Sequence, residues 1–141
     1  NEVVSRTDDA ESALEGLIDF HLDFALGESD LIRIQDRDLG HLPPAAKRQV
    51  RRQQRQYVEI WVDVLRSRDP GLTEADARLT AHATFGLLNS TSHSVKPQAA
   101  KPTAIKTQAK PDTMEAAEAN SRAVLRAMTV AALTSTGRLR R

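Results

Sequence analysis

Three of the four histidines, His21, His82 and His93, are the side chains best placed for acid–base or metal chemistry, and each also has an ordinary structural interpretation. His21 lies on the apolar face of an expected helix, where it is either buried and hydrogen-bonded or in contact with a bound effector. His82 and His93 share one face of a later helix but stand about 16 Å apart along its axis. Because that separation is too large for one metal ion, no metal site is predicted.

No arrangement of residues in the sequence is typical of catalysis. The sequence has no cysteine, and therefore no thiolate nucleophile or thiolate metal site. It also lacks a glycine-rich phosphate loop, a nucleophile elbow and an HExxH motif. Hydroxyls stand beside a histidine in Ser90-Thr91-Ser92-His93, but adjacency in sequence is not the geometry of a catalytic triad. We therefore predict that the chain is not an enzyme and uses no cofactor.

Aromatic side chains provide the best candidate for a ligand pocket. Tyr57 and Trp61 are four residues apart and so share one face of a helix. Such a pair either fills an ordinary core or forms the wall of a cavity for a flat or apolar ligand. Arg33, Arg37 and Asn89 are polar candidates for orienting that ligand. The predicted ligand-binding residues are Phe20, Phe24, Arg37, Tyr57, Trp61, Phe85 and Asn89.

Charge is distributed unevenly along the chain. Residues 1–42 hold eleven acidic and three basic residues, whereas residues 43–141 hold eight acidic and seventeen basic residues. The two parts either pack against each other or keep the protein soluble. A basic run from Lys47 to Arg55 is either a solvated helix face or a surface for an anion, such as a phosphate or the acidic part of the protein.

The segments that carry these residues have the periodicity of helices, and no alternating strand pattern of useful length occurs. The sequence therefore predicts an all-α domain over residues 10–135. Five main helices are expected, over about residues 10–26, 30–39, 44–68, 74–93 and 113–135.

Turn and capping residues set the expected boundaries. Gly27 is a plausible helix stop, Pro43-Pro44 opens the longest helix, and Asp69-Pro70-Gly71 is a turn signal. Thr73 is the expected cap of the next helix. Outside the helices we expect a frayed lead-in at 1–9, a mobile basic loop at 95–112 and a basic tail at 136–141.

Small residues on one face of the helix over 74–93 predict close packing against another helix. Gly86 in its middle costs ~1 kcal/mol relative to alanine unless something needs the space. The final helix has apolar residues on two sides, which indicates that its own core covers one and a neighbour the other. The predicted homodimer interface comprises His82, Ala83, Gly86, Ser90, His93, Ala116, Ala119, Ala123 and Ala127.

The order of these segments resembles the C-terminal regulatory domain of TetR-type (tetracycline-repressor-like) transcription regulators over about residues 10–135. The motifs that carry the resemblance are Leu42-Pro43-Pro44, Tyr57 with Trp61-Val62, Asp69-Pro70-Gly71-Leu72, Phe85-Gly86-Leu87-Leu88-Asn89-Ser90 and a final Ala- and Leu-rich helix. The resemblance implies that the last two helices form a dimeric four-helix bundle with their twofold mates. It also implies a small-molecule effector. Some repressors of this family respond to acyl-CoA thioesters, so an apolar or acyl-type ligand is expected.

In that family a helix-turn-helix head binds operator DNA and precedes this domain. No three-helix segment precedes Asp8, so operator DNA is expected to be bound only through the absent head. The alternative function is a purely structural homodimerisation module without a ligand. No apolar run approaches ~18 residues, so no membrane partner is expected, and a cytoplasmic location is the simplest interpretation.

Overall fold

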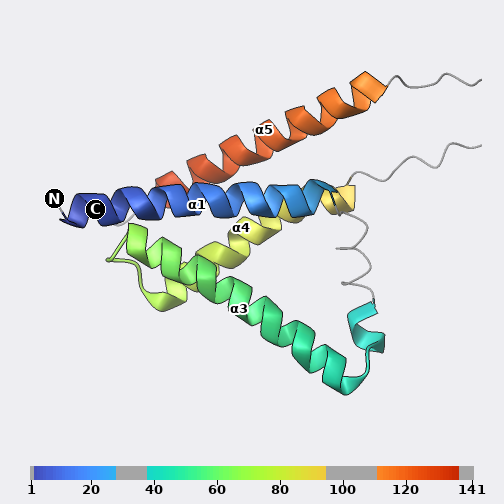
Figure 1. Ribbon diagram of the computed structural model, residues 1–141, viewed down its shortest axis with the longest axis horizontal. Coiled ribbons are helices and arrows are strands. Elements are labelled where there is room, and N and C mark those ends of the chain that lie inside the picture. Colours follow the sequence, from blue (N-terminus) through green and yellow to red (C-terminus); the bar gives the residue numbers. More distant parts are fainter. Residues whose placement is uncertain (1, 28–37, 95–110, 137–141) are drawn as a thin grey trace, which may run out of the picture.

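A computed structural model describes residues 2–27, 38–94 and 111–136 of the chain (Figure 1). These residues form helices and connecting turns, with no strand among them, which confirms the predicted all-α class. The elements are α1 (Glu2–Gly27), the short 3-10 helix η1 (Leu39–His41), α3 (Pro44–Arg68), α4 (Glu74–Ser94) and α5 (Pro111–Thr136).

The predicted lead-in at residues 1–9 is wrong for the part that the structure describes, because α1 begins at Glu2. No glycine or proline precedes Gly16, so nothing in the sequence breaks the helix before its buried face begins at Ala10. The last helix begins at Pro111, two residues before the expected start, since proline fits the first turn of a helix. The short helix expected at 30–39, the basic loop and the basic tail lie almost entirely outside the described residues.

The predicted turn and capping residues take the expected positions. Pro44 stands in the first turn of α3. Between α3 and α4, the Asp69 side chain accepts a hydrogen bond of 3.0 Å from the Gly71 amide. The Thr73 hydroxyl accepts a 3.2 Å hydrogen bond from the Asp76 amide and donates a 2.8 Å one to the Asp76 carboxylate. This reciprocal pair satisfies an amide at the start of α4 that would otherwise have no partner.

The core lies where the four long helices meet, and α1 and α4 each contact both α3 and α5 (Figure 1). Trp61 of α3 is fully buried there, together with Ile18 and Leu22 of α1 and Leu88 of α4. The last helix adds Leu125, Thr129 and Leu133 to the buried set. Three of the four helices therefore converge on the single tryptophan.

Ion pairs join the acidic first helix to arginines from later in the chain. Arg126 of α5 donates a 3.1 Å hydrogen bond to Asp19 of α1, and Arg122 pairs with Asp23. Arg68 of α3 pairs with Glu11. The uneven charge distribution thus helps the two parts of the chain to pack against each other, although each exposed pair contributes only about 0–1 kcal/mol.

None of the helices in the described part of the chain is long and apolar enough to cross a membrane.

Candidate functional site

Four rings from three helices form a cluster at the centre of the domain. The ring of His21 on α1 is stacked against Phe85 of α4 at 5.2 Å and against Tyr57 of α3 at 5.8 Å. Tyr57 and Phe85 are themselves stacked at 5.4 Å, and Trp61 meets Phe85 edge-on at 5.3 Å. These distances and orientations are those of favourable aromatic contacts. We call His21, Tyr57, Trp61, Phe85 and Asn89 the aromatic cluster.

A chain of two hydrogen bonds crosses this cluster. The distance from His21 Nδ1 to Tyr57 Oη is 2.9 Å, and that from His21 Nε2 to Asn89 Oδ1 is also 2.9 Å. The amide oxygen of Asn89 only accepts, so Nε2 carries the proton and donates to it. Nδ1 is then the acceptor, and the Tyr57 hydroxyl donates to it. The ring of His21 thus links α1 to both α3 and α4 through directed contacts.

Burial keeps every group in this chain of hydrogen bonds neutral near pH 7. Desolvation lowers the pKa of His21 below its ordinary value of 6.5, and the hydrogen bond with Asn89 opposes that shift. Desolvation likewise raises the pKa of Tyr57. The cluster is therefore polar but uncharged, which suits contact with an uncharged or apolar group.

The cluster also holds a buried donor without a well-aligned hydrogen bond among the described residues. The indole N–H of Trp61 is buried and makes no well-aligned hydrogen bond in the part of the chain that the structure describes. It lies near the Tyr57 hydroxyl, whose pKa it lowers against the larger effect of desolvation. A buried donor left unpaired costs roughly 1–3 kcal/mol. A ligand acceptor placed beside Trp61 would recover part of that energy.

The structure brings together four of the seven predicted ligand-binding residues, namely Tyr57, Trp61, Phe85 and Asn89. Phe20 lies at the solvent edge, 63% exposed and tilted against Tyr57 at 6.4 Å. Phe24 is half-buried on the same helix, and Arg37 lies outside the described residues. His21 was singled out in sequence for its apolar face, but no spacing within the chain indicates that Tyr57 and Asn89 are its partners.

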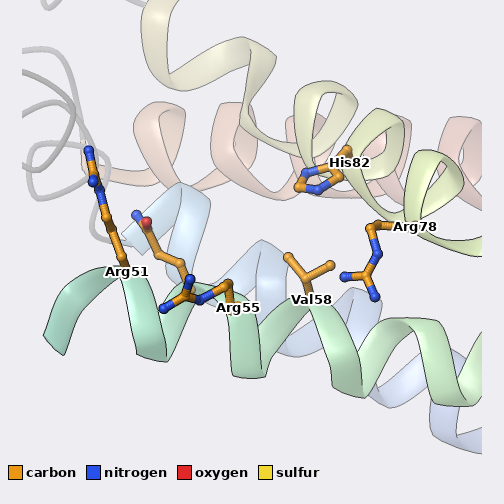
Figure 2. A pocket seen from close by; sticks show the side chains of 6 residues that line it. Arg51, Arg55, Val58, Arg78 and His82 are labelled. Carbon is orange, nitrogen blue, oxygen red and sulfur yellow. The ribbon is translucent and has the colours of Figure 1, made fainter. Parts of the chain in front are cut away.

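A second feature is an open groove of about 300 Å³ between α3 and α4 (Figure 2). Arg51, Arg55 and Val58 rise from α3, while Arg78 and His82 reach toward them from α4 (Figure 2). The lining residues are Arg51, Gln54, Arg55, Val58, Arg78 and His82. We call this feature the α3–α4 groove.

Carboxylates hold one of these arginines in place. Arg78 donates hydrogen bonds of 2.6 and 3.1 Å to the two carboxylate oxygens of Glu59, and one of 2.9 Å to Glu74. These bonds lower the pKa of Glu59 and raise that of Arg78. Sequence analysis missed Arg78 and Gln54, and it assigned His82 to the dimer interface alone.

The residues predicted to form the dimer interface lie on exposed parts of α4 and α5. A side-chain carbon added at Gly86 would meet no atom within 4 Å. Large apolar side chains on the same two helices are also exposed, at 69% for Leu79, 48% for Val124 and 51% for Met128. The exposed predicted residues are His82, Ala83, Gly86, Ser90, Ala116, Ala119, Ala123 and Ala127, while the side chain of His93 lies outside the description.

The described residues thus define an all-α domain whose core contains a polar, uncharged cluster. The family model for the tetracyclin repressor-like C-terminal domain matches residues 7–97, which include most of α1, all of α3 and α4, and all five residues of the aromatic cluster. Because the match covers more than half of the chain, the chain belongs to that family. It is a regulator domain, of a family that is generally non-enzymatic and whose members typically dimerise and bind small-molecule effectors. None of the curated proteins compared with it matches the chain.

Proposed function

We propose that the chain is the effector-binding and dimerisation domain of a TetR-like transcriptional repressor, and that it senses an apolar or acyl-type small molecule. The observation that carries the proposal is the aromatic cluster, in which Tyr57, His21 and Asn89 form a neutral hydrogen-bonded chain inside an apolar core. Ligand sites in proteins are mostly apolar, with a few polar groups that fix orientation. The indole N–H of Trp61, which has no well-aligned hydrogen bond among the described residues, adds a donor for a ligand carbonyl.

The cluster is well placed to convert binding into movement. Its residues come from α1, α3 and α4, so a ligand that enters beside Phe20 and parts the rings changes how these helices pack. A ligand shifts an equilibrium only by its difference in affinity for the two arrangements. In this proposal the arrangement with open rings binds better, and α4 transmits the change to the dimer partner. Operator DNA is bound by a separate helix-turn-helix head in the cytoplasm.

Replacement of Tyr57 by Phe tests the ligand proposal, because it keeps the ring and removes the hydroxyl that donates to His21. We expect CoA thioesters or apolar acids to raise the melting temperature of the wild-type chain, and this shift to fall by at least about half in Y57F. The measurement is a thermal-shift screen. The matched control is Ile60→Ala, which removes a half-exposed apolar side chain from the same helix outside the cluster.

A lack of ligand-induced shift in the wild-type chain across both ligand classes would favour the alternative function. That alternative is a purely structural homodimerisation module, which shares the dimer interface but needs no ligand. If the ligand-induced rise in melting temperature fell equally in Y57F and I60A, the ligand would not bind at the aromatic cluster.

Replacement of Gly86 by Leu tests the proposed dimer of α4 and α5. The new side chain meets open space within one chain, so folding of the monomer should change little. Across a twofold interface it would be inserted twice, and overpacking costs typically 1–3 kcal/mol per site, so association should weaken by roughly 30-fold or more. Sedimentation equilibrium measures the effect.

Gly16→Leu is the matched control for this experiment. Gly16 is an exposed helical glycine on α1, and an added side-chain carbon there also meets no atom within 4 Å. The G16L chain should dimerise like the wild type. A wild-type chain that sediments as a monomer at micromolar concentration, or a G86L chain that dimerises as tightly as G16L, would contradict the proposed interface.

A further inference from the structure

The first half of α3 carries a set of cations that form no ion pair with the carboxylates of the described residues. Lys47, Arg48, Arg51, Arg52 and Arg55 lie within residues 44–58, a segment that contains no acidic residue. None of the five forms an ion pair with the part of the chain that the structure describes. By contrast, four half-buried arginines of α3, α4 and α5 pair with carboxylates, namely Arg68, Arg78, Arg122 and Arg126. The charge of this segment is therefore available to a ligand.

Two of these cations face a concave surface. Arg51, Gln54, Arg55 and Val58 follow the i, i+3, i+4, i+7 spacing of one helix face, and all four line the α3–α4 groove (Figure 2). Like charges four residues apart on a helix are mildly destabilising when nothing lies between them. An anion bound in the groove would attract both guanidinium groups and so offset their mutual repulsion.

On the opposite wall of the groove, the positive charge of Arg78 is already neutralised by carboxylates. Glu59 and Glu74 both form ion pairs with Arg78, so Arg78 gives the groove a fixed edge rather than a free charge. The anion is therefore expected at the Arg51–Arg55 end, whose cations form no ion pair with the described residues. Guanidinium groups bind the oxygens of phosphate in a two-pronged geometry, and Gln54 adds an amide donor beside them.

We propose that the Arg51–Arg55 end of the α3–α4 groove binds a phosphate or pyrophosphate group of a small-molecule ligand. Val58 offers an apolar surface beside that group. A volume of about 300 Å³ is at the lower end for ligand sites, which fits a charged group better than a whole large ligand. His82 also meets Phe85 edge-on at 6.1 Å, so the groove adjoins the aromatic cluster.

The position of the groove favours a small ligand over nucleic acid. The basic half of α3 lies at the end of the molecule away from the N-terminus of α1, which is the end that a preceding DNA-binding head would adjoin (Figure 1). Regulation by the bound anion rests on the proposed sensing function, whereas binding itself does not.

The test is calorimetric titration of the full chain with inorganic pyrophosphate at fixed low salt. We compare the wild type with the double variant Arg51→Gln, Arg55→Gln and with the control Arg48→Gln, Arg52→Gln. Both variants remove two exposed positive charges at the same spacing from the same helix, but Arg48 and Arg52 do not line the groove. Because the groove variant loses two charged hydrogen-bond donors to the anion, it should bind at least about tenfold more weakly, and the control should bind within about threefold of wild type.

Equal weakening in both variants would overturn the proposal, because net charge alone would then explain the binding. So would the absence of saturable binding to the wild type, or tighter binding of a duplex DNA oligonucleotide than of pyrophosphate that depends on Arg51 and Arg55. Failure of the sensing function gives a different result. In that case pyrophosphate still binds and depends on the groove arginines, but no ligand in the thermal-shift screen responds to Tyr57→Phe.

Discussion

Replacing Trp61 by Ala will lower the free energy of unfolding by roughly 3–5 kcal/mol, the range found for truncation of large buried aromatics. Trp61 is fully buried where α1, α3 and α4 meet, and its ring contacts His21, Tyr57 and Phe85. A cavity of this size cannot be closed without moving whole helices, since protein interiors are close-packed. Urea denaturation followed by circular dichroism measures the loss.

The control for Trp61→Ala stands one residue earlier on the same helix. Ile60 is 50% exposed, so Ile60→Ala should cost less than about 1 kcal/mol. If the rings line a cavity that a ligand fills, the loss in the ligand-free W61A chain will be smaller than the packing range while the ligand-induced thermal shift disappears. A loss similar to that of I60A, with the ligand response intact, would contradict both interpretations of Trp61.

Replacing His21 by Leu will lower the free energy of unfolding at pH 7.5 by roughly 1–3 kcal/mol, because Tyr57 and Asn89 both lose their hydrogen bond to the imidazole. The leucine side chain is apolar and of similar size, so the effect reports the polar partners more than lost volume. A gain in stability would show that the hydrogen bonds do not offset the burial of the imidazole.

The same variant will change how stability depends on pH. Because burial lowers the pKa of His21 below 6.5, the unfolded chain takes up this proton at a higher pH than the folded chain. The contribution of His21 to the free energy of unfolding is therefore fully present above pH 6.5. It falls as the pH decreases below that value, by at most about 1.4 kcal/mol per pH unit. The H21L chain should lose this part of the pH dependence of stability. His41→Gln, which removes an exposed histidine and leaves His21 in place, should retain it.

Much of the fold could be predicted because local signals decide it. Pro43-Pro44, Asp69-Pro70-Gly71 and Thr73 act through their own backbone and nearest neighbours, and the structure places helix ends at all three. The start of α1 was missed because residues 2–9 have neither a breaker nor a strong apolar face. Periodicity therefore gave no reason to extend the helix to Glu2.

The candidate site was predictable only within single helices. Spacing puts Tyr57 and Trp61 on one face, but which residues of α1 and α4 meet them depends on how the helices cross. That is why Phe20, expected inside the cluster, stands mostly in solvent, and why His21 holds the central place instead. For the same reason, the sequence did not indicate that Arg78 and His82 line one groove with Arg51 and Arg55.

The ion pairs between α1 and α5 make the attachment of the last helix sensitive to ionic strength. Arg122 and Arg126 reach Asp19 and Asp23 with partly exposed side chains, so dissolved ions compete with these contacts. Tyr57, His21 and Asn89 are joined by neutral groups, which salt affects far less. Raising the salt concentration should therefore speed amide hydrogen exchange in α5 while α3 keeps its protection. The helix predicted to face the partner chain can thus loosen without opening the centre of the domain.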